Sequence, residues 1–311
     1  MNYYAFLAPL LFLFACNTVQ ERPQEASATP ETVPGHFSGG LSDYWYEGKA
    51  EINTYTLAQA RYGEIHPGQV SLIFVSEDFL TDKQVKNDNY TNPNSTPIIK
   101  TNMIRRFVTG TYDYSIMSSV FTPTETSSQP HTLKVTTSMQ DWCGQTFTQL
   151  NYQGEKVWKS QLRSYFEGEG DLNELLPADF LEDEVFNRIR SGWKQLPTGN
   201  FRVIPNTSFL LMTHQPYKAH AAVLTLGDYA GDEFEADNLK RYVVDFTNLG
   251  RQLEVVFDAD APYVIRGWNE TIKSRGQELT TTARLTHQVK APYWSQNSVA
   301  DRGKRANLGL K

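Results

Sequence analysis

The chain has 311 residues, of which 40% are hydrophobic, 13% aromatic and 21% charged, and its formal net charge is −6. This composition is typical of a globular protein and excludes a largely disordered one. The excess of acidic over basic residues argues against a nucleic-acid-binding protein, because binding to phosphates needs a cationic surface. Two cysteines are too few for a disulfide scaffold.

The first sixteen residues have the pattern of a bacterial lipoprotein signal peptide. Residues 5–15 form an apolar run, AFLAPLLFLFA, which has the length of a signal-peptide core and is too short to cross a bilayer as a helix. The run ends in Leu13-Phe14-Ala15-Cys16, which resembles a lipobox. The resemblance implies cleavage before Cys16 and its modification with palmitate-type acyl chains, which would hold the chain on a membrane.

The position after the lipidated cysteine bears on where the protein is held. Asn17 follows Cys16, so no aspartate is present there to signal retention in the inner membrane. We therefore expect a cell-envelope protein anchored to the outer membrane and facing the periplasm or the cell surface. No later stretch has the roughly 18 consecutive apolar residues of a transmembrane helix.

Composition divides the chain into four parts. The residues after Cys16 are rich in Pro and Gly and poor in large apolar side chains, so they bury too little surface to offset the entropy of ordering. The last residues are polar and are expected to be solvated. We predict a signal peptide (1–15), a disordered tether (16–40), a β-rich body (41–290) and a polar C-terminal tail (291–311).

The body alternates short β-type runs with turns. Runs rich in β-branched and aromatic residues predict strands at 51–61, 69–79, 104–120, 132–137, 146–152, 201–211, 221–226, 240–247, 251–257, 263–268 and 280–286. Their close spacing favours an antiparallel meander over alternating strands and helices. The predicted fold class is mainly β, a curved antiparallel sheet or half-barrel with one or two short helices.

One segment has helical periodicity. Residues 177–190 place Leu181, Val185 and Ile189 on one apolar stripe. Acidic residues crowd the start of this helix and arginines its end, which matches the helix dipole, and a glycine at 192 is the predicted stop. If the body divides, we expect the seam near 171–197.

Cys143 is the sharpest candidate for chemistry. It is unpaired once Cys16 is lipidated. Trp142-Cys143-Gly144 resembles the thioredoxin active site, but Thr146 stands where the second cysteine is needed, which excludes dithiol chemistry. A thiol nucleophile also needs a histidine base, and no histidine lies in a cysteine-hydrolase motif. We expect a small buried residue in a strand, with a catalytic thiol as the alternative.

Other candidate sites are weaker. The acidic stretches 167–171 and 228–237 contain oxygen ligands of the kind that Ca²⁺ binds, but they lack EF-hand spacing and are interpreted as solvated loops. Asp258 and Asp260 are interpreted as turn formers before Pro262 rather than as a catalytic pair. Because no motif for a catalytic metal, a nucleotide or a serine nucleophile is present, no metal or cofactor is predicted.

Several motifs in residues 41–290 resemble those of envelope lipoproteins that are common in Bacteroidetes. They are Tyr44-Trp45-Tyr46-x-Gly48-Lys49-Ala50-Glu51, Gln59-Ala60-Arg61-Tyr62-Gly63-Glu64, Asp141-Trp142-Cys143-Gly144, Ala261-Pro262-Tyr263, Gly267-Trp268 and Thr280-Thr281-Thr282. The resemblance implies no catalytic residues. Such proteins are sometimes labelled septum formation inhibitor Maf, but the loop of that nucleotide pyrophosphatase is missing here, so we expect no such activity. By fold alone, the predicted sheet is similar to LolA/LolB-like half-barrels.

These features predict a non-enzymatic, membrane-anchored envelope lipoprotein that binds a lipid, a glycan or a protein partner through a face of its sheet. The alternatives are an envelope thiol-dependent hydrolase using Cys143 and a structural component of an envelope assembly. A lipid ligand requires an apolar groove, a hydrolase requires an exposed Cys143 beside a histidine, and an assembly requires an exposed apolar patch.

Overall fold

The computed structural model describes residues 41–274 and 276–310. The predicted signal peptide, the lipidation site Cys16 and the tether lie outside the described residues. All described residues belong to one compact unit, and the segment 171–197, the place predicted for a seam, lies within it. None of the described helices has both the length and the apolar character needed to cross a membrane.

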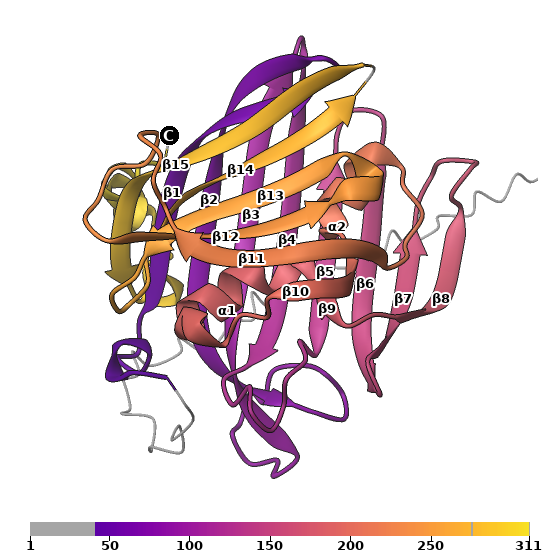
Figure 1. The fold of residues 1–311 in the computed structure, drawn as a ribbon. Coiled ribbons are helices and arrows are strands. Elements are labelled where there is room, and N and C mark those ends of the chain that lie inside the picture. The colour runs from indigo at the N-terminus through magenta and orange to yellow at the C-terminus, as the bar shows by residue number, and fades with distance from the viewer. Residues whose placement is uncertain (1–40, 275, 311) are drawn as a thin grey trace, which may run out of the picture. The chain divides into compact units, whose positions relative to one another are not determined.

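A single sheet of fifteen strands makes up most of the body, which confirms the predicted fold class (Figure 1). Two arms extend from the central neighbours β1 and β15. The first arm holds β1 (Ala50–Arg61), β2 (Glu64–Leu80), β3 (Ser95–Thr109), β4 (Tyr112–Pro123), β5 (Lys134–Gln140), β6 (Gln145–Gly154), β7 (Val157–Arg163) and β8 (Asp171–Pro177). The second arm holds β9 (Phe180–Leu181), β10 (Gly199–Ile204), β11 (His220–Asp228), β12 (Leu239–Phe246), β13 (Arg251–Asp258), β14 (Ile265–Ser274) and β15 (Gln277–Ala291).

The link between the two arms makes the sheet curve. The chain leaves β8 at one edge of the sheet and enters β9 at the opposite edge two residues later. Both linker residues bond to a neighbouring segment, since Ala178 N donates to Lys156 O (2.9 Å) and Asp179 N donates to Arg202 O (2.8 Å). Three residue steps span only about 10 Å. The two edges therefore approach each other, and the sheet bends round its concave side.

That concave side is filled by residues 178–213, here called the inner segment. Besides β9 and β10, it contains the 3-10 turn η2 (Glu182–Glu184), the helix α1 (Val185–Gly192), the turn η3 (Trp193–Gln195) and the helix α2 (Thr207–Thr213). Helix α1 contacts β3 and β4 on the first arm and β14 on the second, while α2 contacts β4 and β5. The main hydrophobic core lies between these helices and the two arms.

The helix predicted at 177–190 begins later, at Val185. Its apolar stripe is confirmed, since Leu181, Val185 and Ile189 are fully buried, and the helix ends at the predicted glycine. The residues before Val185 extend the sheet instead, because Phe180 and Leu181 pair with β10 in the one parallel bridge recorded among the described strands. An apolar stripe does not reveal that its first member belongs to a strand.

Two predicted strands are divided in the structure. The run 104–120 is a hairpin that turns at Gly110, whose φ of +59° favours glycine. The run 201–211 is strand only as far as Ile204 and continues as α2. Asn206 starts this helix, since its side-chain oxygen accepts hydrogen bonds from the backbone N–H of Ser208 (3.0 Å) and Phe209 (3.3 Å). Strands β7 and β8 have no counterpart among the predicted runs.

The C-terminal tail differs from a fully solvated segment. Residues Val299–Leu308 form a 3-10 helix, η6, whose basic side chains in the middle are exposed. Its end contacts the sheet, where Thr54 Oγ1 donates to Leu308 O (2.6 Å) and Gln69 Nε2 donates to Gly309 O (2.8 Å). Both partners lie in β1 or β2, so the polar tail is fixed to the sheet by its last residues.

An ion pair between the inner segment and β1 is fully buried. The guanidinium of Arg190 in α1 binds the carboxylate of Glu51, and neither side chain is exposed. The same guanidinium lies over the rings of Trp45 and Phe74, with centroid distances of 5.0 and 5.4 Å. This pair ties the helix to the sheet at a point that water does not reach.

We expect Arg190→Leu to lower the free energy of unfolding by about 3–5 kcal/mol, because Glu51 would be left buried without its cation. The matched control is Arg241→Leu, which breaks the surface pair with Glu254 (3.2 Å) and is expected to cost no more than about 1 kcal/mol. Urea denaturation measures both. Equal losses in the two variants would contradict the role given to the buried pair.

Candidate functional site

Three sets of residues are candidates for function, and they lie in different parts of the fold. One is the charged interior of the body. The other two lie at opposite ends of the first arm, because its strands are antiparallel and successive connections alternate between the ends. The turn end carries the β1–β2, β3–β4 and β5–β6 connections. The loop end carries the β2–β3, β4–β5 and β6–β7 connections.

The interior candidate centres on three consecutive acidic residues of η2. From the sequence, these residues are predicted to lie at the start of a helix and to interact with its dipole. In the structure all three side chains are buried, and each has a different hydrogen-bond partner. Glu182 accepts from Arg251 Nη1 (2.5 Å), and Glu184 accepts from Arg188 Nη2 (2.8 Å). Asp183 has no arginine partner among the described contacts. It accepts instead from the backbone N–H (3.0 Å) and hydroxyl (2.8 Å) of Thr207.

Charge counting explains why Asp183 stands apart. The interior holds the carboxyl groups of Glu51, Glu182, Asp183, Glu184 and Glu270 and the guanidinium groups of Arg105, Arg188, Arg190 and Arg251. The acids outnumber the arginines by one. Burial raises the pKa of Asp183 to about 7, so its protonation near neutral pH brings this interior cluster to balance. Each of these groups has at least one partner within the protein, and we interpret the cluster as structural.

Asp183 should make stability depend on pH. Its pKa in the folded protein is about 7, against roughly 4 when unfolded, so the folded state holds the proton more tightly. The stabilising contribution is complete below about pH 4 and is lost as the pH rises to about 7. We expect Asp183→Asn to remove this pH dependence in urea denaturation between pH 5 and 8. The exposed-residue control Glu278→Gln should retain it, and an unchanged profile for Asp183→Asn would contradict the assignment.

Cys143 lies at the turn end and is exposed, so the prediction of a buried strand residue is wrong. It sits in the connection between β5 and β6. The carboxylate of Asp141 accepts hydrogen bonds from the backbone N–H of Cys143 (2.7 Å) and Gly144 (3.1 Å), which forms a tight turn. The ring of Tyr165 covers Gly144 so closely that a Cβ there would meet it at 2.6 Å. The turn chemistry therefore presents the thiol to solvent.

The hydrolase alternative also requires a histidine beside this thiol. The side chain of Cys143 lies beside Tyr165, and no described contact joins it to a histidine. His214 is occupied elsewhere at the same end, where Nδ1 is 2.6 Å from Oε1 of Glu169 and the ring packs against Phe166. The thiol of Cys143 is therefore exposed, as a catalytic thiol would have to be, but no described contact places a histidine base beside it.

We expect the exposed thiol to react with a thiol reagent in the native protein at a rate close to that of the unfolded chain. In the Cys16→Ala variant Cys143 is the remaining cysteine, so the signal is unambiguous. Cys143→Ala should abolish labelling and shift the melting temperature by less than about 2 °C, because few packing contacts are lost. Slow labelling that accelerates on unfolding would show that the thiol is shielded.

The larger of two described cavities lies at the loop end and is here called the loop cavity. Its volume is about 590 Å³, within the range of small-molecule sites. Two connections of the first arm and the end of β6 form its walls. The lining residues are Thr81, Asp82 and Gln84 from the β2–β3 connection, Ser128, Gln129, Pro130, His131 and Leu133 from the β4–β5 connection, and Tyr152, Gln153 and Gly154 from the end of β6.

Gln84 holds these connections together. It adopts a left-handed backbone conformation with φ of +50° and is almost fully buried. Its side-chain Nε2 donates to Tyr152 O (2.7 Å) and its Oε1 accepts from Asn151 Nδ2 (2.7 Å). Its backbone carbonyl accepts from Lys134 Nζ (3.1 Å). One residue of the β2–β3 connection is therefore bonded to β5 and β6.

An aromatic cluster forms one wall of the loop cavity. The rings of His131 and Tyr152 have centroids 5.0 Å apart, and both pack on the buried Trp158, at 5.6 and 5.1 Å. The indole of Trp158 is fixed by a hydrogen bond to Thr132 O (3.0 Å). Burial lowers the pKa of His131, so its ring is neutral at pH 7. His131 and Tyr152 are half-buried and face the cavity with uncharged rings.

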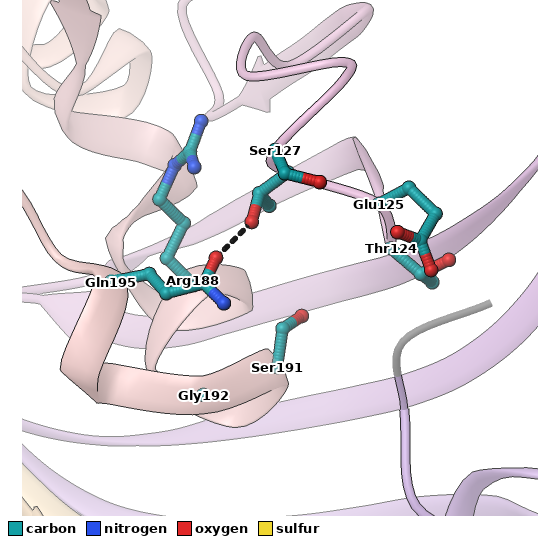
Figure 2. Close-up of a pocket in the computed structure, with 8 residues that line it drawn as sticks. Thr124, Glu125, Ser127, Arg188, Ser191, Gly192 and Gln195 are labelled. Carbon is teal, nitrogen blue, oxygen red and sulfur yellow. Dashed lines mark hydrogen bonds between the residues drawn. The ribbon is translucent and has the colours of Figure 1, made fainter.

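A second, smaller cavity lies between the β4–β5 connection and the end of α1. Figure 2 shows Thr124, Glu125 and Ser127 on one side and Arg188, Ser191, Gly192 and Gln195 on the other. Its volume is about 70 Å³, which leaves room for only a few water molecules at about 30 Å³ each. We do not interpret it as a ligand site.

The remaining sequence candidates are not brought together in the structure. Among residues 41–274 and 276–310, no three His, Cys, Asp or Glu side chains are placed to hold a metal ion. Asp258 forms a two-bond pair with Arg266 (both 2.7 Å), and Asp260 accepts from Asn238 Nδ2 (3.2 Å). The loop cavity itself was not predicted, because its residues come from three separate segments of the chain and form no motif.

Comparisons with known proteins add no family to this picture. Neither the search against models of protein families nor the search of curated proteins finds a match. The resemblance to Bacteroidetes envelope lipoproteins stays a prediction from the motifs.

Proposed function

We propose that the protein is a membrane-anchored, non-enzymatic lipoprotein of the cell envelope that binds a polar, glycan-type ligand in the loop cavity. The observation that carries this proposal is a cavity of about 590 Å³ lined by hydroxyl and amide side chains beside two uncharged aromatic rings. Such a combination suits saccharides, whose ring C–H groups pack on aromatic faces and whose hydroxyl groups need hydrogen-bond partners.

The filled interior supports a polar ligand over a lipid. A lipid carrier needs an apolar groove on the concave side of its sheet. Here that side is occupied by α1 and α2, whose apolar residues are packed against both arms. The predicted binding through a sheet face is thus less well supported than binding among the connections at the loop end.

The anchor rests on the sequence pattern around Cys16, which implies acylation and a location in the envelope. The hydrolase alternative is favoured by the exposure of Cys143 and opposed by its partners, Asp141 and Tyr165. The assembly alternative is favoured by Leu172 and Leu175 of the edge strand β8, which are 41% and 66% exposed. Neither alternative accounts for the loop cavity.

The anchor is tested by membrane fractionation of cells that express the full chain. The wild-type protein should remain with membranes after a high-salt wash and should incorporate labelled palmitate, whereas Cys16→Ala should lose the label, because the acyl chains are attached at that cysteine. Palmitate incorporation that persists in the variant would contradict the lipoprotein assignment.

Ligand binding is tested separately by thermal shift on the full-length Cys16→Ala protein. A polysaccharide fraction from the envelope should raise the melting temperature, whereas a total lipid extract should not. Ser128→Trp places a bulky ring in the loop cavity and should abolish the shift. Ser127→Trp is the matched control, because the neighbouring Ser127 lines the smaller cavity instead. Stabilisation by the lipid extract, blocked by Ser128→Trp, would contradict the proposal.

A further inference from the structure

We infer that the loop cavity selects donor-rich saccharides, uncharged or carrying amino groups, and rejects anionic ones. This inference rests on the proposed function and names its ligand class. It follows from which polar groups of the cavity wall are already bonded within the protein and which are left for a ligand.

The groups left unbonded are mainly hydrogen-bond acceptors. Gln129 Oε1 is buried and has no partner among the described residues. Gln153 uses its Nε2 on the backbone oxygens of Asn151 and Tyr152 (both 3.2 Å), and no described bond reaches its Oε1. A ligand that satisfies these oxygens must present O–H or N–H groups.

The hydroxyl donors of the wall are already committed. Thr81 Oγ1 donates to Asn94 O (3.3 Å), and Ser128 Oγ donates to Glu125 O (3.4 Å). Both hydroxyl oxygens keep lone pairs that can accept from a ligand. The amide of Gln84 is spent on Tyr152 and Asn151 and offers nothing further. Donors remain on the neutral ring of His131, the hydroxyl of Tyr152 and the Nε2 of Gln129, which no described hydrogen bond uses.

The charge of the cavity wall is negative, and a negative wall, like an excess of acceptor oxygens, favours ligands that present hydrogen-bond donors. Asp82 carries the carboxylate among the lining residues, and it is exposed. Its Oδ1 accepts from the backbone N–H of Lys83 (2.8 Å), and no described bond reaches Oδ2. None of the nearby lysines lines the cavity: Lys134 donates to the Gln84 carbonyl (3.1 Å), Lys156 pairs with Asp179 (3.2 Å), and the exposed Lys83 is outside the wall.

An anionic sugar would therefore meet a carboxylate and unpaired acceptor oxygens without a guanidinium or ammonium group on the wall. Like charges and facing acceptors both disfavour binding. A hydroxyl-rich ring can satisfy the acceptors and pack on Tyr152. An amino sugar adds a charge-assisted hydrogen bond to Asp82.

The test is calorimetric titration of the full-length Cys16→Ala protein with three tetrasaccharides of matched length. The probes are a glucosamine tetramer, cellotetraose and a galacturonate tetramer, which are cationic, neutral and anionic. We expect the first two to bind and the third to bind at least about tenfold more weakly. Asp82→Asn should remove most of the preference of the cationic over the neutral probe. The matched control is Asp88→Asn, because Asp88 lies in the same connection, outside the cavity wall, and pairs with Lys86 (3.7 Å).

The outcomes separate the inference from the proposed function. Binding of the galacturonate tetramer that equals that of cellotetraose and is lost in Ser128→Trp overturns the ligand class, but leaves saccharide binding in the cavity intact. Binding of all three probes that survives Ser128→Trp, or binding of none, overturns both. An equal effect of Asp82→Asn and Asp88→Asn overturns the role of Asp82.

Discussion

Buried ion pairs between the inner segment and the sheet hold this fold together. The inner segment fills the concave side with apolar residues and also carries charged side chains. These charged side chains form ion pairs with residues on both arms. Arg190 meets Glu51 on β1, and Glu182 meets Arg251 on β13. A buried charge without its partner costs several kcal/mol. Such pairs therefore tolerate few alternative positions of α1, and they specify where the two arms lie around it.

The same interior contacts reach the loop cavity. Glu184 accepts a hydrogen bond from Thr132 Oγ1 (2.7 Å), and its partner Arg188 donates to the backbone carbonyl of Pro130. Thr132 and Pro130 flank His131, which forms part of the cavity wall. The connection that carries His131 is thus held on one side by Glu184 and Arg188. On another side it is held by Trp158, which donates to Thr132 O and packs against the ring of His131. A rigid wall of this kind lowers the entropy cost of binding.

Filling the concave side also decides where a ligand can bind. In a curved sheet with an open face, the face itself would be the natural site. Here α1 and α2 take that place, and the loop end holds the larger of the two described cavities. The turn end carries exposed aromatic residues and Cys143, but no described cavity of comparable size. The packed interior therefore stabilises the fold, and the candidate binding site lies at one end of the sheet.

The sequence by itself determined the fold class, most strands and the apolar stripe at 181, 185 and 189, because each depends on local periodicity. The envelope signal at Cys16 stays a prediction from a short contiguous motif. Only the tertiary structure decided that 201–211 splits between strand and helix, that the acidic residues 182–184 are buried, and that Cys143 is exposed. It also decided the loop cavity, whose walls are far apart in the chain. Burial and charge pairing depend on which segments meet in space, and no local pattern in one segment carries that information.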